Sequence, residues 1–188
     1  MKVNRIQSAA MTVLLMLLAG PAAAQDVNGY RLNPGDVLQV SVWNEEELNR
    51  EVLVRPDGGV SFPLVGDVAA ANRTVTDVQE AIRVRLQSYV PEAVVTVAVL
   101  AVNGNKIYVL GKVARPGEYV MNSKLDVMQA LSVAGGVTSF AAENKIQILR
   151  RGPTGEQQAL SFRYGDVKEG DSLRENIMLK SGDVVVVP

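Results

Sequence analysis

The chain has 188 residues with nearly balanced charge, 19 Lys+Arg against 20 Asp+Glu, and it contains neither cysteine nor histidine. These absences exclude disulfides, a lipidated cysteine, the commonest zinc ligand and any nucleophile activated by histidine. We expect no nucleic-acid partner, because there is no basic excess, and we expect no metal and no cofactor.

The first 24 residues have the organisation of a secretory signal peptide. Lys2 and Arg5 form a positive region, Ala9 to Ala19 form an apolar run, and Ala22–Ala24 form a small-residue cleavage site. An N-terminal membrane anchor is the alternative, although the apolar run is shorter than the roughly 20 residues that span a bilayer. We therefore expect export to the periplasm, where loss of the two positive residues changes the net charge from −1 to −3.

The stretch after the signal predicts short strands and turns. Val37–Trp43 alternates in the manner of a half-buried strand. Glu45–Glu47 is a charge run, for which a solvated loop or helix start is favoured over a divalent-ion site. Pro56-Asp57-Gly58 predicts a turn between two short strands, Glu51–Arg55 and Gly59–Pro63, and residues 64–68 are expected to continue extended.

A helix is predicted from Thr74, because Asp77 stands at the capping-box position three residues on. Its expected buried stripe is Val75, Val78, Ile82, Leu86 and Tyr89, and Pro91 is expected to end it. A strand then covers Ala93 to Val102, and Asn103-Gly104 predicts a hairpin turn into the next strand.

The stretch from Ile107 to Gly136 predicts a hairpin followed by a helix. Strands 107–113 and 118–121 flank Pro116-Gly117, which suits a type II turn. Ser123 with Asp126 has capping-box spacing, so a helix is expected to start there and to end at Gly135. This order is typical of the opening of a β-grasp unit, which is a platform for binding or assembly.

The remaining chain predicts further strands at 145–150, 156–162, 176–180 and 183–187, with a polar loop over 164–175. Leu32 to Val37 is echoed by Leu179 to Val184 in its Gly-Asp-Val ending, and residues 64–68 have a counterpart in 109–113. These echoes favour two related small units, and the predicted fold class is α+β.

The candidate binding residues lie around the Pro116-Gly117 turn. Arg115 and Glu118 flank it and could face a sugar or a neighbouring subunit, with a solvated hairpin tip as the alternative. Tyr119 and Trp43 could stack on a sugar ring, although a core position is favoured for lone aromatic residues. Gly135-Gly136 is favoured as a helix stop over a ligand contact.

No catalytic residues are predicted. Paired carboxylates could hydrolyse a glycan, and Asp57 and Asp67 are the best placed, but both lie in segments that need a turn former anyway. For Asp36 and Asp57, hydrogen bonding to the backbone of their own turns is favoured over a binding role.

These residues resemble the polysaccharide export (Wza-type) family, secreted proteins that carry capsule and exopolysaccharide across the Gram-negative envelope. The matching blocks occur in the family's order: Tyr30–Leu32, Pro34–Asp36, Arg55–Gly58, Phe62–Leu64, Thr74-Val75 and Val95–Val97. Further blocks are similar to the soluble-ligand-binding β-grasp (SLBB) module that follows the export (PES) domain: Val109–Val113, Pro116-Gly117, Tyr119 and Ala134–Gly136.

The resemblance implies a signal peptide over 1–24, an export domain over 25–102, and an SLBB domain with a closing strand over 103–188. Better-known members carry a lipidated cysteine, a further β-grasp module and a C-terminal helix that forms an outer-membrane pore. Because this chain has no cysteine and is expected to end after one module, we expect an unlipidated periplasmic protein, with outer-membrane association left open.

Three functions stay open. The preferred one is a non-enzymatic conduit or adaptor in capsule or exopolysaccharide export. Its expected partners are the polysaccharide, copies of itself in a ring, an inner-membrane polysaccharide co-polymerase and a separate outer-membrane pore protein. The alternatives are a monomeric periplasmic glycan-binding protein and a hydrolase of the polymer.

Overall fold

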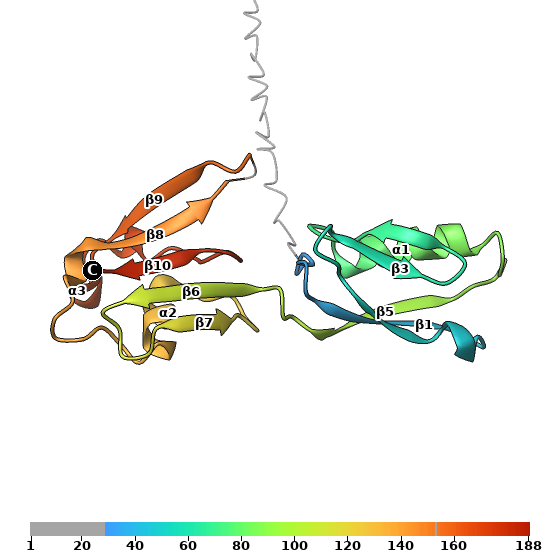
Figure 1. Cartoon of the computed structure of the whole chain (residues 1–188), viewed down its shortest axis with the longest axis horizontal. Coiled ribbons are helices and arrows are strands. Elements are labelled where there is room, and N and C mark those ends of the chain that lie inside the picture. The colour runs from blue at the N-terminus through green and yellow to red at the C-terminus, as the bar shows by residue number, and fades with distance from the viewer. Residues whose placement is uncertain (1–28, 153) are drawn as a thin grey trace, which may run out of the picture.

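The computed structural model describes residues 29–152 and 154–188, so the predicted signal peptide lies outside the described residues. Two lobes lie end to end along the long axis: an N-terminal lobe (residues 30–101, blue to green) and a C-terminal lobe (106–187, yellow-green to red) (Figure 1). Each lobe has its own sheet and its own buried core. The helices and strands together confirm the α+β class.

The N-terminal lobe is built on a three-stranded antiparallel sheet in the order β2-β1-β5. Its strands are β2 (Arg50–Leu53), β1 (Val37–Val42) and β5 (Val95–Ala101). The predicted alternation along β1 is confirmed, because Leu38, Val40 and Val42 are buried and the residues that alternate with them are half-buried. The short 3₁₀ helix η1 (Glu46–Leu48) follows β1.

A separate hairpin pairs β3 (Gly59–Phe62) with β4 (Gly66–Ala69). The prediction that residues 64–68 continue extended is confirmed for 66–68, which lie in β4, and wrong for 64 and 65, because the chain turns over 63–65. Leu64 adopts a left-handed φ of 65° between Pro63 and Gly66. Those two flanking residues are turn formers, and they outweigh the strand preference of the apolar residues between them.

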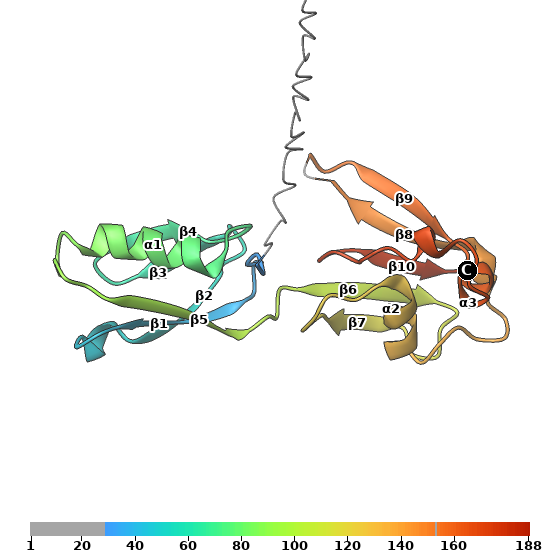
Figure 2. The same ribbon diagram turned by 180° about the vertical axis from the view of Figure 1, so that it is seen from behind.

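Helix α1 (Val75–Leu86) starts with the predicted capping box. The Asp77 N–H donates to Thr74 Oγ1 at 3.2 Å, and the Thr74 N–H donates to Asp77 Oδ2 at 3.0 Å. The helix, β3 and β4 all lie on one side of the β1–β5 layer (Figure 2). Tyr89, which was expected in the buried stripe, is 60% exposed because the helix already ends at Leu86.

The passage from β5 to β6 (Lys106–Gly111) connects the two lobes. The predicted hairpin at Asn103-Gly104 is wrong, since β5 and β6 belong to different sheets. β5 pairs with β1, whereas β6 pairs with strands of the C-terminal lobe. A local turn signal indicates a change of direction, but the pairing partner depends on residues far away in the sequence.

The C-terminal lobe contains a five-stranded sheet in the order β7-β6-β10-β8-β9. The hairpin of β6 and β7 (Gly117–Val120) and that of β8 (Ile146–Arg151) and β9 (Gln157–Phe162) form as predicted. The type II turn predicted for Pro116-Gly117 is wrong, because Gly117 does not have the positive φ that this turn needs and already belongs to β7. The closing strand β10 (Val184–Val187) lies in the centre of the sheet, parallel to β6 and antiparallel to β8.

Helix α2 (Val127–Val133) lies in front of β6 and β7 in the view of Figure 2. It starts later than predicted: Asp126 is the N-cap residue itself, with Gln129 completing the capping box, so Ser123 lies outside the helix. The predicted stop is confirmed, because Gly135 has a φ of 83° and the Gly136 N–H donates to Leu131 O at 2.8 Å.

The predicted loop over 164–175 is in part helical, with α3 (Tyr164–Lys168) and the 3₁₀ helix η3 (Leu173–Glu175). Arg163 holds the two together through contacts with Asp166 at 3.0 Å and Glu175 at 2.9 Å. The predicted strand over 176–180 is wrong, since only Met178 forms a bridge, to Asp126. A further 3₁₀ helix, η2 (Glu143–Lys145), precedes β8.

Candidate functional site

The end of the β6–β7 hairpin brings the three predicted binding residues together. Arg115 and Glu118 are exposed, and Tyr119 is half-buried against the core of the C-terminal lobe. The Tyr119 hydroxyl donates to the backbone oxygen of Arg115 at 2.5 Å. This bond closes the turn between the two strands, so the tip has a defined shape.

Arg115 also contacts the end of α2. Its N–H donates to Ala134 O and its Nη2 donates to Val133 O, both at 2.9 Å. A cation is favourable at this position, because the last carbonyls of a helix have no partners within the helix. Arg115 therefore stabilises the fold in the described structure, and a binding role for it stays a prediction.

Glu118 contacts Lys106 across the hairpin, with 3.1 Å between Lys106 Nζ and Glu118 Oε2. The hydrogen bond that Lys106 donates to Glu118 raises the pKa of Lys106. Both side chains are substantially exposed, so the pair contributes little to stability. Glu118 remains accessible for contact with a partner, because its side chain is exposed in this ion pair.

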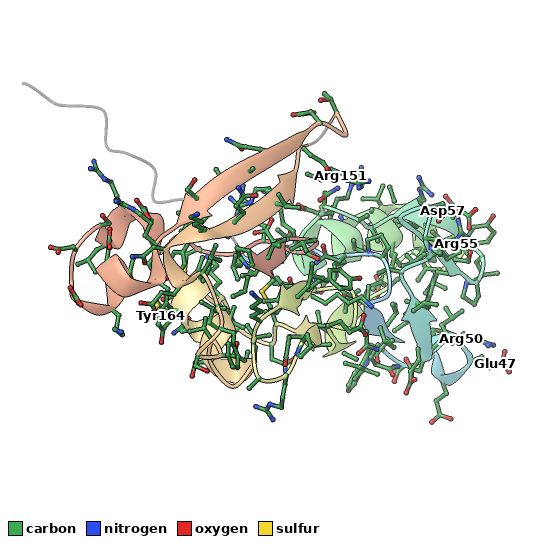
Figure 3. All side chains as sticks on the ribbon, turned by 60° about the vertical axis from the view of Figure 1, so that its left-hand side comes forward. Glu47, Arg50, Arg55, Asp57, Arg151 and Tyr164 are labelled. Carbon is green, nitrogen blue, oxygen red and sulfur yellow. The ribbon has the colours of Figure 1, made fainter. Side chains whose placement is uncertain are left out.

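The two acids considered for catalysis both contact Arg55, at 2.9 Å for Asp57 and 2.8 Å for Asp67. Figure 3 shows Arg55 and Asp57 side by side. Hydrogen bonds from Arg55 lower the pKa of both carboxyls, that of Asp67 to about 2. These groups are ionised near neutral pH and are poor proton donors. Asp57 also accepts the Gly59 N–H at 3.0 Å, which confirms its expected role in its own turn.

The acidic run Glu45–Glu47 lies at the outer end of the N-terminal lobe, where Figure 3 shows Glu47 and Arg50. Within residues 29–188 except 153, no three His, Cys, Asp or Glu side chains are grouped so that they could hold a metal ion.

Trp43 at the end of β1 is 73% exposed. The expectation of a core position is therefore wrong for Trp43, which follows the last buried residue of the strand.

The outer face of the three-stranded sheet carries exposed apolar side chains. We call it the open face; its members include Leu53 on β2, Leu100 on β5 and, at its far end, Trp43 and Val94. Leu53, Leu100 and Val94 are each more than half exposed. Helix α1 and the β3–β4 hairpin cover the opposite face (Figures 1 and 2). The open face is therefore available for contact with another molecule.

The echo between the two halves corresponds to two similar turns: the Asp36 turn (residues 33–36) and the Asp183 turn (180–183). Asp36 and Asp183 are the charged residues that are buried in the described part of the chain. In each turn the carboxylate accepts the backbone N–H three residues earlier, at 2.8 Å. This confirms the expected role of Asp36 in ordering its own turn.

The two turns meet at Gly104, between the lobes. The Gly104 N–H donates to Asp36 Oδ1 at 2.9 Å, and the Ser181 hydroxyl donates to Gly104 O at 2.9 Å. A Cβ at Gly104 would lie 2.2 Å from Pro34 O. We call these contacts the joint. Sequence reasoning missed it, although the Gly-Asp echo was the signal that pointed to both turns.

The described residues include no helix that is both long and apolar enough to cross a membrane. Two family models match the chain in order. The model of the polysaccharide biosynthesis/export protein matches residues 24–100, and the SLBB domain model matches residues 106–160. The first match covers the N-terminal lobe, and the second covers most of the strands of the C-terminal lobe.

Several curated proteins are similar to the chain. The EPS I polysaccharide export outer membrane protein EpsA of Ralstonia nicotianae is 29% identical, over 89% of this chain and 49% of its own length. The exopolysaccharide production protein ExoF of Rhizobium meliloti is 32% identical, over 68% of this chain and 33% of its own. The capsule polysaccharide export outer membrane protein CtrA of Neisseria meningitidis is 28% identical, over 83% and 43%.

The chain thus spans about half the length, or less, of these relatives. The similarity nonetheless runs through both lobes, and it agrees with the order of the two family models. The chain belongs to the polysaccharide biosynthesis/export protein family, with an export domain followed by an SLBB domain.

Proposed function

We propose that the chain is a non-enzymatic periplasmic component of a machine that exports capsule or exopolysaccharide to the outer membrane. The relatives support the pathway, because they are named as polysaccharide export or exopolysaccharide production proteins. In this proposal the chain is a conduit or adaptor. It contacts the polymer, an inner-membrane polysaccharide co-polymerase and a separate outer-membrane pore protein.

The observation that carries the assembly part of the proposal is the open face. This face has exposed apolar side chains at both of its ends and no described element of the chain over it, which supports a surface that is covered by a partner. We propose that further copies of the chain cover it and form a closed ring, since a patch meeting a different patch on the next copy generates a ring when the rotation closes. The hairpin tip with Arg115, Glu118 and Tyr119 is proposed as a second contact, with a neighbouring subunit or with the polymer.

The non-enzymatic part is supported by the state of the two candidate acids. A glycosidase needs one carboxyl whose pKa is raised so that it can protonate the leaving oxygen. Asp57 and Asp67 have lowered pKa values, because Arg55 is hydrogen-bonded to both. Arg55 therefore keeps both carboxyls ionised, so the pair lacks the protonated acid that this chemistry needs.

Native mass spectrometry of the exported protein tests the assembly. We expect a closed ring of several copies for the wild type and a monomer for Leu53→Asp combined with Leu100→Asp, because two charges would be buried without partners. Phe140→Asp is the control: Phe140 is 82% exposed but lies in the other lobe, so this variant should keep the ring. A monomeric wild type would instead favour the glycan-binding alternative.

A deletion strain tests the pathway. Polymer secretion should fail in the deletion strain and return with the wild-type gene. Normal secretion without the gene would refute the export role. Release of oligosaccharide from the polymer by the purified protein would refute the non-enzymatic part.

A further inference from the structure

A cleft of about 880 Å³ lies where the β8–β9 hairpin approaches the N-terminal lobe. Figure 3 shows Arg151 on this hairpin, on the side that faces the N-terminal lobe. The volume is within the range of roughly 300–1,000 Å³ that is typical of ligand sites. Its lining comes from both lobes and consists of Asn72, Arg150, Arg151, Gly152, Glu156, Gln158 and Lys180.

Two cations in this cleft have unused hydrogen-bonding capacity. Arg151 and Lys180 are exposed, and neither side chain has an ion pair or hydrogen bond within the described parts of the chain. The charge of Glu156 opposes them in part, while its carboxylate accepts a hydrogen bond from the Thr154 hydroxyl. The cleft therefore has a net positive charge without an acid that neutralises both cations.

A third cation, Arg150, is held in position behind them. Its Nη2 lies 2.7 Å from Asp183 Oδ2 and donates to Met178 O at 3.0 Å, and its Nε donates to Asp183 Oδ1 at 3.0 Å. Nη1 has no hydrogen bond to any described residue, and the side chain retains 18% exposure. Arg150 is thus a fixed cation in the cleft wall, and a preorganised group loses little entropy on binding.

The lining favours a sugar over a protein segment. It contains no apolar side chain, whereas the centre of a protein interface is enriched in aromatic and apolar residues. Asn72 and Gln158 provide amides that can both donate to and accept from hydroxyl groups, and Glu156 provides a further acceptor. Hydroxyl groups next to an anionic group are the pattern that this set of side chains matches.

We propose that this cleft binds carboxylate-bearing sugar units of an acidic polysaccharide, with Arg151 and Lys180 as the donors to the carboxylate and Arg150 as a fixed positive charge in the wall. The inference rests on the proposed export function and adds a substrate class to it. The cleft differs from the hairpin tip predicted from sequence, and it is built from both lobes.

The test is calorimetric titration of the exported full-length protein with hexagalacturonate and with the same oligosaccharide after reduction of its carboxyl groups. We expect binding of the acidic form that weakens with added salt, and binding at least about tenfold weaker for the reduced form. The double variant Arg151→Gln/Lys180→Gln should lose at least about tenfold in affinity for the acidic form. Lys112→Gln/Lys124→Gln removes the same charge from exposed sites outside the cleft and should bind as the wild type does.

Equal affinity for the two oligosaccharides, or unchanged affinity in the cleft variant, would overturn the proposal. If the cleft variant instead changed the mass of the assembly without changing sugar binding, the occupant would be another copy of the chain and the proposal would be wrong. Complementation of the deletion strain distinguishes failure of the proposed binding site from failure of the proposed export function. If the wild-type gene restored secretion but the protein did not bind the acidic sugar, the export function would stand and the proposed binding site would be refuted. If the protein bound the acidic sugar but the deletion strain secreted normally, the binding site would stand and the export function would be refuted.

Discussion

The Asp36 turn and the Asp183 turn have nearly the same backbone but different partners. Gly35 and Gly182 have left-handed φ values of 101° and 86°. In each turn the aspartate N–H also donates to the carbonyl three residues earlier, at 3.1 Å. The same Gly-Asp pair thus occurs in both turns and accompanies the same local shape in two different lobes.

The two turns differ in the groups outside the turn that contact each aspartate carboxylate. Asp36 is held by neutral donors, the Tyr30 hydroxyl at 2.6 Å and the Gly104 N–H at 2.9 Å, whereas Asp183 faces the Arg150 guanidinium. Burial, together with the bond to Asp36, raises the pKa of Tyr30, so this hydroxyl remains a donor. The Asp36 carboxylate therefore serves the connection between the lobes, whereas the Asp183 carboxylate fixes a cation at the cleft.

The largest expected effect is on the free energy of unfolding, and it differs between Asp183 and Asp36. Asp183→Ala should lower the free energy of unfolding by about 3 kcal/mol, because it leaves the mostly buried Arg150 without its counter-ion. Asp36→Ala should cost about 2 kcal/mol, because its partners are neutral donors. Urea denaturation measures both, with Asp171→Ala as an exposed control that should stay near wild type. Equal costs would contradict the distinction between a charged and a neutral partner.

A smaller effect is expected at the joint. Gly104→Ala places a methyl group against the Pro34 carbonyl, so backbone must shift and stability should fall by about 2 kcal/mol or less. Amide hydrogen exchange should accelerate in both turns, since Gly104 contacts both. Gly117→Ala is the matched control, because a Cβ there meets no atom within 4 Å. If both variants behaved alike, the joint would not restrain the two turns.

The elements that could be predicted from the sequence are those that depend on near neighbours. The capping box of Thr74, the Pro116-Gly117 hairpin and the Gly135 stop each need only residues within a few positions. Asp126 shows the limit of this reasoning: it was expected to complete a capping box, but it caps the helix itself, because Gln129 supplies the reciprocal bond.

The joint and the cleft could not be predicted in this way. The contact of Gly104 with Ser181 joins residues 77 positions apart, and the cleft brings Asn72 near Lys180. Sequence reasoning placed Gly104 in a hairpin, because a turn signal does not tell which strands will pair. Lys180 was expected in a strand, and nothing in its neighbourhood indicated a partner from the other lobe.

The smallest expected effect contrasts the part-buried Arg150–Asp183 pair with the exposed Arg55–Asp67 pair. Arg55 holds the pKa of Asp67 at about 2, below its ordinary value of 3.8, so this pair stabilises the folded state fully above about pH 4. That contribution is lost as the pH falls from about 4 to about 2, where Asp67 becomes protonated. Thermal unfolding should therefore show a shallower acid-side loss of stability for Asp67→Asn than for the wild type.

The Asp67→Asn variant should be only slightly less stable than the wild type at pH 7, because solvent screens an exposed pair. Asp171→Asn, at an exposed position away from Arg55, should keep the acid-side slope of the wild type. If Asp67→Asn instead destabilised the protein at pH 7 as much as Asp183→Ala does, burial would not be what separates the two ion pairs.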